Sequence, residues 1–220
     1  MKSSRLFKFT GIAGILLYLL VLLEIPLYFF YTPTPAGTPP VPIILYRIGI
    51  DLLICLGAIT FFSGLKTIID RHTPQLLGTG TLLFAAALCF AIVSLVADSM
   101  QAGAAWGAGS QPVNPTFVGQ GANGALLIYG PINRLLTTMM LVTGSAWLLQ
   151  ARLLPRWMAW LGFVCAVYNA AFIPTYFFMT TPLDFYSVNG WNIPLAAGMF
   201  FLWILVVSIG LVVRSKRQEG

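Results

Sequence analysis

Five ionisable side chains lie within stretches of the chain that are otherwise almost entirely apolar. They are Glu24, Arg47, Asp51, Asp98 and Arg134. A charged side chain at the centre of a bilayer costs at least about 2.5–3.5 kcal/mol, so such residues face the interior of a helix bundle and pair there or line a polar cavity. Arginine suits either role, because its guanidinium stays charged and presents five donors in a planar fork. These residue types therefore predict either an ion-pair network or a site for a small polar or ionic ligand.

The spacing of these residues suggests partners. Arg47 and Asp51 are four residues apart and would share one face of a helix, which predicts an ion pair between them. Arg134 follows the dipeptide 130–131, Gly-Pro, by about one turn, and a proline there removes a backbone hydrogen bond and kinks a helix. Arg134 must then meet a carboxylate, a carbonyl group or an anionic ligand. Glu24 is the first choice, because Asp51 already has Arg47 and Asp98 lies nearer water.

Asparagine and tyrosine side chains accompany the charges at similar or shallower predicted depths. The complete candidate cluster is Glu24, Arg47, Asp51, Asp98, Asn133, Arg134, Asn169, Tyr176 and Asn192. It is either a ligand-binding cavity or a dry structural network, and the sequence leaves both open. No catalytic residue is assigned, because the single histidine, His72, lies outside the predicted spans. No Cys/His spacing suits zinc, so no metal is expected and any cofactor stays unknown.

Composition identifies the kind of protein that holds this cluster. The chain has 220 residues, of which 58% are hydrophobic and 8% charged, whereas soluble domains carry about 25% charged residues. The net charge of +6 comes from bases scattered in twos and threes, not from the dense basic face that nucleic-acid binding requires. We therefore predict an all-α, polytopic membrane protein that lies in a lipid bilayer and binds no nucleic acid.

Six stretches contain the roughly 20 mostly apolar residues that a membrane-spanning helix needs. The predicted spans are residues 9–31, 43–65, 75–97, 124–149, 157–179 and 191–213. Residues 1–220 form a single transmembrane domain in this interpretation, and short connections make its helices antiparallel neighbours. The long connection 99–123 carries no charge and is predicted to be an outer loop, which either folds over the cluster as a lid or stays a flexible extracellular loop.

The distribution of basic residues predicts an orientation. Ten of the twelve Lys and Arg residues precede the first span, follow the sixth, or lie in the second and fourth connections. Because cytoplasmic loops carry an excess of Lys and Arg, both termini are predicted to be cytoplasmic. The first span then runs outward, and helix rise places the five charged residues in the outer half of the bilayer.

Two local strings resemble a known family. Residues 46–53, YRIGIDLL, are similar to an R-x-G-I-x-x-D-L opening of a second span, and residues 153–162, LLPRWMAWLG, resemble an LPRWLGWLG entry to a fifth span. Both strings resemble a bacterial six-helix membrane family that is catalogued only as a domain of unknown function. The resemblance implies a six-helix fold in a bacterial plasma membrane, and it implies no established reaction.

Three functions remain open at this point. The polar cavity could bind or transport a small molecule, an ion or an amphiphile. The chain could instead be an accessory subunit whose apolar faces pack against larger membrane-protein partners. It could also be an enzyme in which Glu24, Asp51 and Asp98 supply acid and base while Arg134 clamps an anionic group of a lipid-like substrate. A void lined by the charges would favour binding, and a filled network would favour the accessory role.

Overall fold

A computed structural model describes residues 3–30, 40–107, 122–177, 185–188 and 192–218 of the chain. Within these ranges every regular element is helical, which confirms the predicted all-α class. The elements are α1 (Ser3–Glu24), α2 (Pro26–Phe29), α3 (Val41–His72), η1 (Pro74–Leu76), α4 (Leu77–Gly107), α5 (Ala122–Leu127), η2 (Ile128–Ile132), α6 (Asn133–Ala151), α7 (Arg156–Ala171), η3 (Ile173–Phe177) and α8 (Asn192–Arg217).

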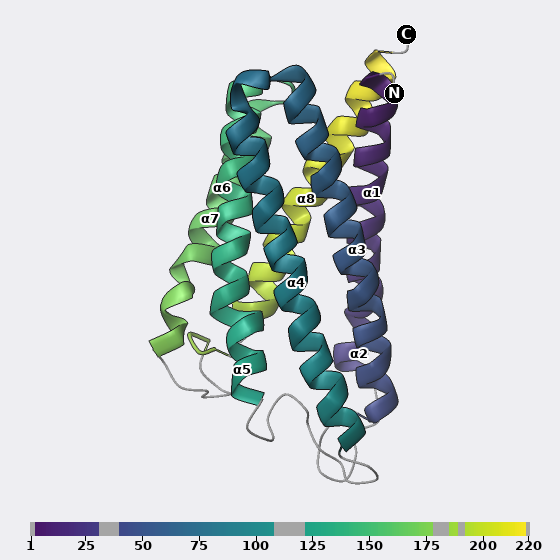
Figure 1. Cartoon of the computed structure of the whole chain (residues 1–220), viewed down its shortest axis with the longest axis vertical. Coiled ribbons are helices and arrows are strands. Elements are labelled where there is room, and N and C mark those ends of the chain that lie inside the picture. The colour runs from purple at the N-terminus through teal and green to yellow at the C-terminus, as the bar shows by residue number, and fades with distance from the viewer. Residues whose placement is uncertain (1–2, 31–39, 108–121, 178–184, 189–191, 219–220) are drawn as a thin grey trace.

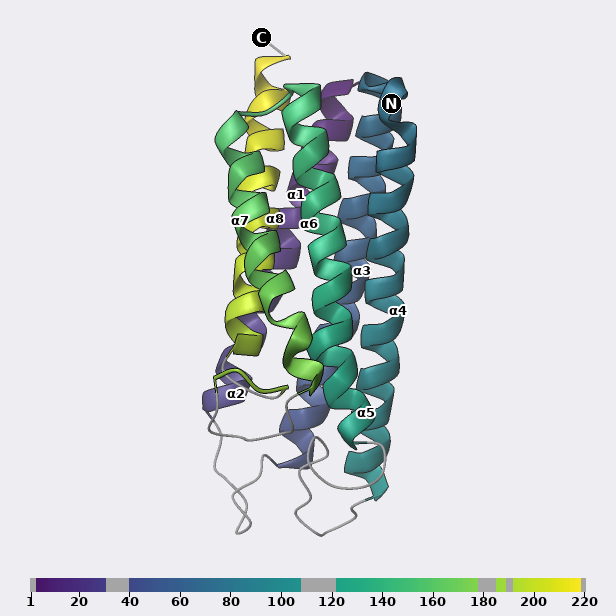
Figure 2. The ribbon, with the colours of Figure 1, turned by 90° about the vertical axis from the view of Figure 1, so that its left-hand side faces the viewer.

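The long helices form a closed ring in chain order (Figures 1 and 2). α1 packs against α3, α3 against α4, α4 against α6, α6 against α7 and α7 against α8, and α8 closes the ring against α1. Neighbours run antiparallel, so both ends of the chain lie at the same end of the bundle (Figure 1). We call this the terminal end and the opposite one, which carries α2 and α5, the distal end.

Five helical segments of the described ranges are long and apolar enough to cross a membrane. They are Ser3–Phe29, Val41–His72, Pro74–Gly103, Arg156–Phe177 and Asn192–Arg217. The stretch expected as a further span at 124–149 forms α5, η2 and α6 and is not among the five. Its polar content explains the difference, because the 19-residue α6 begins with Asn133 and Arg134 and carries three threonines.

The observed helices differ from the predicted spans mainly at their ends. α3 continues to His72 and α4 to Gly107, so the first part of the predicted loop 99–123 is helical. The helices extend because hydropathy marks where apolar sequence ends, while helical hydrogen bonding continues into polar sequence. The remainder of that loop, residues 108–121, lies outside the described residues, and so does the predicted lid.

Proline and backbone geometry set several boundaries. Pro40 has an extended conformation and precedes α3, and Pro155 does the same before α7. Within η2, Gly130 has φ −85° and ψ −108°, which is not helical, and Pro131 follows it in a π-helical turn. The predicted interruption one turn before Arg134 is therefore confirmed. Single π-helical turns inside longer helices are frequent at functional sites.

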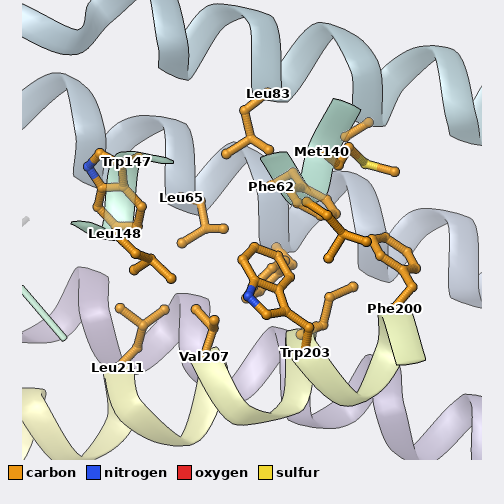
Figure 3. Close-up of a cluster of buried hydrophobic side chains, with 14 of the residues drawn as sticks. Phe62, Leu65, Leu83, Met140, Trp147, Leu148, Phe200, Trp203, Val207 and Leu211 are labelled. Carbon is orange, nitrogen blue, oxygen red and sulfur yellow. The ribbon is translucent and has the colours of Figure 1, made fainter. Parts of the chain in front are cut away.

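An apolar core fills the terminal half of the ring (Figure 3). Trp147, Trp203, Phe62 and Leu65 are at most 1% exposed and interdigitate with aliphatic side chains from the surrounding helices. The indole N–H groups are satisfied, since Trp203 donates to the Met158 carbonyl at 3.1 Å and Trp147 to Thr73 Oγ1 at 3.1 Å. This half of the bundle is therefore closely packed.

Close helix approach in this core depends on glycine. A Cβ atom added at Gly162 would collide with Ser145 Oγ and with the Trp203 indole, and one added at Gly144 would meet the Trp203 ring at 2.6 Å. At Gly198, by contrast, an added Cβ atom would have no heavy atom within 4 Å. Small residues let membrane helices approach closely enough for such packing.

We predict that Gly162→Ala lowers the free energy of unfolding by about 1–3 kcal/mol, because the methyl group overpacks a rigid core. Reversible unfolding in mixed micelles measures this change. Gly198→Ala is the matched control and should be neutral or stabilising by up to about 1 kcal/mol, since alanine is the better helix former. Equal effects of the two substitutions would contradict the packing argument.

Candidate functional site

A cavity of about 280 Å³ lies inside the distal half of the ring. Its walls come from α1, α2, α3, α4, η2, α6, α7 and α8. All five charged residues singled out in the sequence line it, namely Glu24, Arg47, Asp51, Asp98 and Arg134. Asn133 and Asn169 line it as well. Phe200 forms part of the boundary with the apolar core, since its ring stacks on Phe62 at a centroid distance of 6.3 Å.

Arg134 is 3% exposed and is held by oxygen atoms of two other segments. Its Nη1 donates to the Phe172 carbonyl at 2.9 Å and to Thr175 Oγ1 at 3.0 Å. Its Nη2 donates to Asn192 Oδ1 at the start of α8. The expected pairing of Arg134 with Glu24 is therefore wrong. The Phe172 carbonyl at the end of α7 and the Thr175 hydroxyl in the 3₁₀ turn that follows accept from Arg134 in place of a carboxylate.

Arg47 pairs with no carboxylate of the described residues, although three carboxyl groups share its cavity. Its guanidinium carbon lies 3.6 Å from the centroid of the Tyr28 ring, in a cation–π arrangement. The predicted ion pair between Arg47 and Asp51 is not formed, because no charged atoms of the two come within 4.0 Å. The ion pair that the described residues show, Lys66 with Asp70 at 2.5 Å, lies near the terminal end.

Glu24 and Asp51 form one acidic group on the α1–α3 side of the cavity. Tyr28 donates its hydroxyl to Glu24 Oε1 at 2.7 Å, and Asp51 lines the same cavity as Glu24. The spacing of Asp51 from Arg47 suggested an ion pair within α3, which is not formed. Asp51 instead shares the cavity with Glu24 of α1, an arrangement of two helices that spacing along one helix does not reveal.

Asp98 and Asn133 form a second polar group, between α4 and the α5–α6 segment. Tyr129 donates its hydroxyl to Asp98 Oδ1, and the Asn133 amide donates to Ser94 Oγ at 3.0 Å. Asp98 is 1% exposed and Asn133 8% exposed, yet Asp98 Oδ2 and Asn133 Oδ1 have no hydrogen-bond partner among the described residues. Buried acceptors without partners are costly, and each needs a physical explanation.

Two predicted members of the cluster do not line the cavity. Tyr176 is 59% exposed and packs edge-on against Phe177, so it lies on the outside of the bundle. Asn192 is fully buried and acts as a link, because it accepts from Arg134 and donates to the Ser187 carbonyl at 2.9 Å. Asn169 lines the cavity but donates to the Cys165 carbonyl within its own helix at 2.9 Å.

Four contributors escaped sequence reasoning. Tyr28 lies four residues after Glu24, so its contact could have been found from helical spacing. Tyr129, Ser94 and Thr175 meet partners more than 30 residues away in the chain. Only the tertiary structure brings those pairs together.

The chemistry available at the cavity is recognition by charge and hydrogen bonding. In the described part of the chain no group of three His, Cys, Asp or Glu side chains is arranged to hold a metal ion. The cysteines there are free thiols, and Cys55 lines the cavity while Cys165 does not. Carboxyl, guanidinium, amide and phenol groups are the functional groups that a ligand would meet.

We predict that Arg134→Lys lowers the free energy of unfolding by about 1–3 kcal/mol, because an ammonium group cannot reproduce the bonds to both η3 and α8. Asn192→Ala should also destabilise the protein. The double variant should lose less than the sum of the two, by about 0.5–3 kcal/mol, in a double-mutant cycle.

Unfolding in mixed micelles provides the measurement. Arg156→Lys is the control, because Arg156 is exposed at the start of α7 and its replacement should change stability by less than about 0.5 kcal/mol. Strictly additive losses for Arg134 and Asn192 would show that their hydrogen bond does not link α6 to α8.

Comparisons with protein-family models, with curated proteins and with solved structures find no match to this chain. The resemblance of residues 46–53 and 153–162 to a bacterial six-helix family thus stays a prediction. The function must be inferred from the cavity itself.

Proposed function

We propose that this chain is a six-span membrane protein whose distal cavity binds or transports a small polar molecule or ion. The observation that carries the proposal is the separation of the charged groups. Three carboxyl and two guanidinium groups line a space of about 280 Å³, and no carboxylate among them lies within 4.0 Å of a guanidinium. A network built only for stability would bring opposite charges together, because an unpaired buried charge is strongly destabilising.

The arrangement of the ring supports a sixth span formed by α5, η2 and α6. Because neighbouring helices are antiparallel and the chain ends share one end of the bundle, the number of crossings should be even (Figure 1). The polar residues that lower the hydropathy of this segment, Asn133 and Arg134, are buried among other helices and do not face lipid. A buried polar face is compatible with a membrane crossing.

The basic residues support cytoplasmic termini. Arg71, Arg152, Arg156 and Arg214 all belong to the terminal end of the bundle, and so do the helix ends that carry them. With this end in the cytoplasm, the cavity lies in the outer half of the bilayer. A bacterial plasma membrane, implied by the resemblance, is part of the same proposal.

The alternative functions receive less support. An accessory subunit would present apolar faces to partners, but the exposed apolar side chains around the bundle, such as Leu56 and Val167, suit lipid equally well. That role also gives no reason for a charge-lined space. An enzymatic role stays open, and no contact among the described cavity residues favours it.

The native cysteines provide a test of the cavity. Cys55 lines it and is 4% exposed, whereas Cys165 is 1% exposed and lies in packed core. Both thiols contact a backbone carbonyl, Cys55 that of Ala91 at 4.0 Å and Cys165 that of Met199 at 3.5 Å. They differ chiefly in access to the cavity.

We predict that iodoacetamide, a small neutral alkylating reagent, modifies Cys55 at least about ten times faster than Cys165, because access controls the reaction of thiols of similar burial. Two single-cysteine variants are reconstituted in lipid nanodiscs, and intact mass spectrometry follows their alkylation at mildly alkaline pH. Equal rates, or a slower reaction at Cys55, would contradict a cavity that admits small polar molecules.

The topology is tested separately with single cysteines in a chain whose native cysteines are replaced. Gln75→Cys and Gln150→Cys at the terminal end should escape a membrane-impermeant thiol reagent in intact cells, whereas Phe177→Cys, 80% exposed at the distal end, should react. Permeabilised cells provide the control, in which all three should react. Labelling of Gln150→Cys with protection of Phe177→Cys in intact cells would show that α5, η2 and α6 do not cross the membrane while α7 does.

A further inference from the structure

The cavity has an excess of hydrogen-bond acceptors on its walls. Among the described lining residues, the buried polar atoms without a partner are Asp98 Oδ2, Asn133 Oδ1 and Arg47 Nε. Two of these three are acceptor oxygens, and both lie on the α4–α6 side. Two neighbouring donors serve other acceptors, since Tyr129 donates to the other Asp98 oxygen and the Asn133 amide donates to Ser94.

The charges of the cavity show the same imbalance. Three carboxyl groups face two guanidinium groups, and the protein directs its own cations elsewhere. Arg134 uses three hydrogen bonds on Phe172, Thr175 and Asn192. Arg47 lies against the Tyr28 ring and forms no ion pair with Glu24, Asp51 or Asp98. The acidic side of the cavity therefore lacks a partner that is both positively charged and rich in donors.

The rest of the lining is apolar and limits the size of a partner. Ile54, Phe90, Ala196 and Phe200 form the side of the cavity that meets the apolar core. The volume of about 280 Å³ lies just below the range of sites for drug-sized molecules, roughly 300–1,000 Å³. A compact ligand with one polar end and a short apolar body matches these dimensions.

We propose that the cavity takes a small primary ammonium compound with an apolar body. Its N–H groups donate to Asp98 and Asn133, and its apolar part lies against Phe90 and Phe200. The inference rests on the proposed function and names the ligand class of the same site. An ammonium group supplies three donors and a positive charge at once, which is what the two partnerless acceptors and the surplus carboxyl group require.

Protection of Cys55 from iodoacetamide tests the ligand class, because Cys55 shares the cavity with Asp98 and Asn133. Three probes carry the same apolar body and differ in the polar group: phenethylammonium, 2-phenylethanol and 3-phenylpropionate. Phenethylammonium should slow the alkylation of Cys55 at a concentration at least about tenfold lower than the alcohol needs, as expected for hydrogen bonds to charged groups. The anion should give no more protection than the alcohol.

Asp98→Asn should reduce the advantage of phenethylammonium over the alcohol at least about tenfold, because the amide keeps the shape of the side chain and removes its charge. Asp70→Asn is the matched control and should leave the advantage unchanged, since Asp70 pairs with Lys66 at the other end of the bundle. The melting temperature of each variant, measured in the same nanodiscs, shows whether it is folded.

The outcomes separate this inference from the proposed function. If Cys55 reacts no faster than Cys165 when no probe is present, the accessible cavity itself is wrong. If Cys55 reacts rapidly but the alcohol or the anion protects it as well as phenethylammonium does, the cavity stands and the ammonium inference is overturned. An advantage of phenethylammonium that survives Asp98→Asn would equally overturn the assigned recognition.

Discussion

A guanidinium group that is buried away from water still has five N–H donors, which need acceptors within the protein. In this chain the buried guanidinium is that of Arg134, and its acceptors lie in the distal half of the bundle. Three acceptors satisfy part of this demand: the Phe172 carbonyl at the end of α7, the Thr175 hydroxyl in the 3₁₀ turn η3 and the Asn192 amide oxygen at the start of α8. Asn192 in turn donates to the carbonyls of Phe185 and Ser187, which precede α8 in the chain. One buried cation thus fixes the relative positions of α6, η3 and α8. The wall of the cavity on this side depends on it.

The two halves of the ring are packed differently: apolar side chains fill the terminal half, and polar side chains surround a cavity in the distal half. In the terminal half, Gly144 and Gly162 let neighbouring helices approach the Trp203 ring closely, and aromatic and aliphatic side chains fill the interior. Phe200 marks the transition, because it contacts Phe62 on one side and lines the cavity on the other. Beyond it the inward positions carry carboxyl, amide and guanidinium groups, which cannot replace apolar side chains at similar density without leaving polar atoms unsatisfied. A space remains because the packed half holds the helices in place.

The sequence predicted which residues gather but not how they pair. Helix rise fixes depth, so residue numbers alone place Glu24, Asp51 and Arg134 at one level of the bundle. Pairing depends on the rotation of each helix and on competing partners. The four-residue spacing of Arg47 and Asp51 does not reveal the Tyr28 ring of another helix, against which the Arg47 guanidinium packs. The partners of Arg134 lie 38 or more residues away in the chain, on a turn that no periodicity reveals. Hydropathy likewise located the helices but not their ends, since α4 continues to Gly107 through residues that resemble a loop in composition.

The separation of charge within the cavity has an energetic consequence for its occupant. Replacing even a buried ion pair by apolar side chains of similar volume is often neutral or stabilising by about 1–4 kcal/mol, so buried charges that do not pair lower the stability of the fold. The acidic residues lie on α1, α3 and α4, and Arg134 is fixed to η3 and α8 across the ring. A ligand that neutralises the acidic side also removes the cost of holding unpaired acceptors on α4 and α6, and its apolar part meets α8 at Phe200. A bound ligand would therefore link these helices across the cavity. In a network without a ligand, ion pairs between the helices would do so.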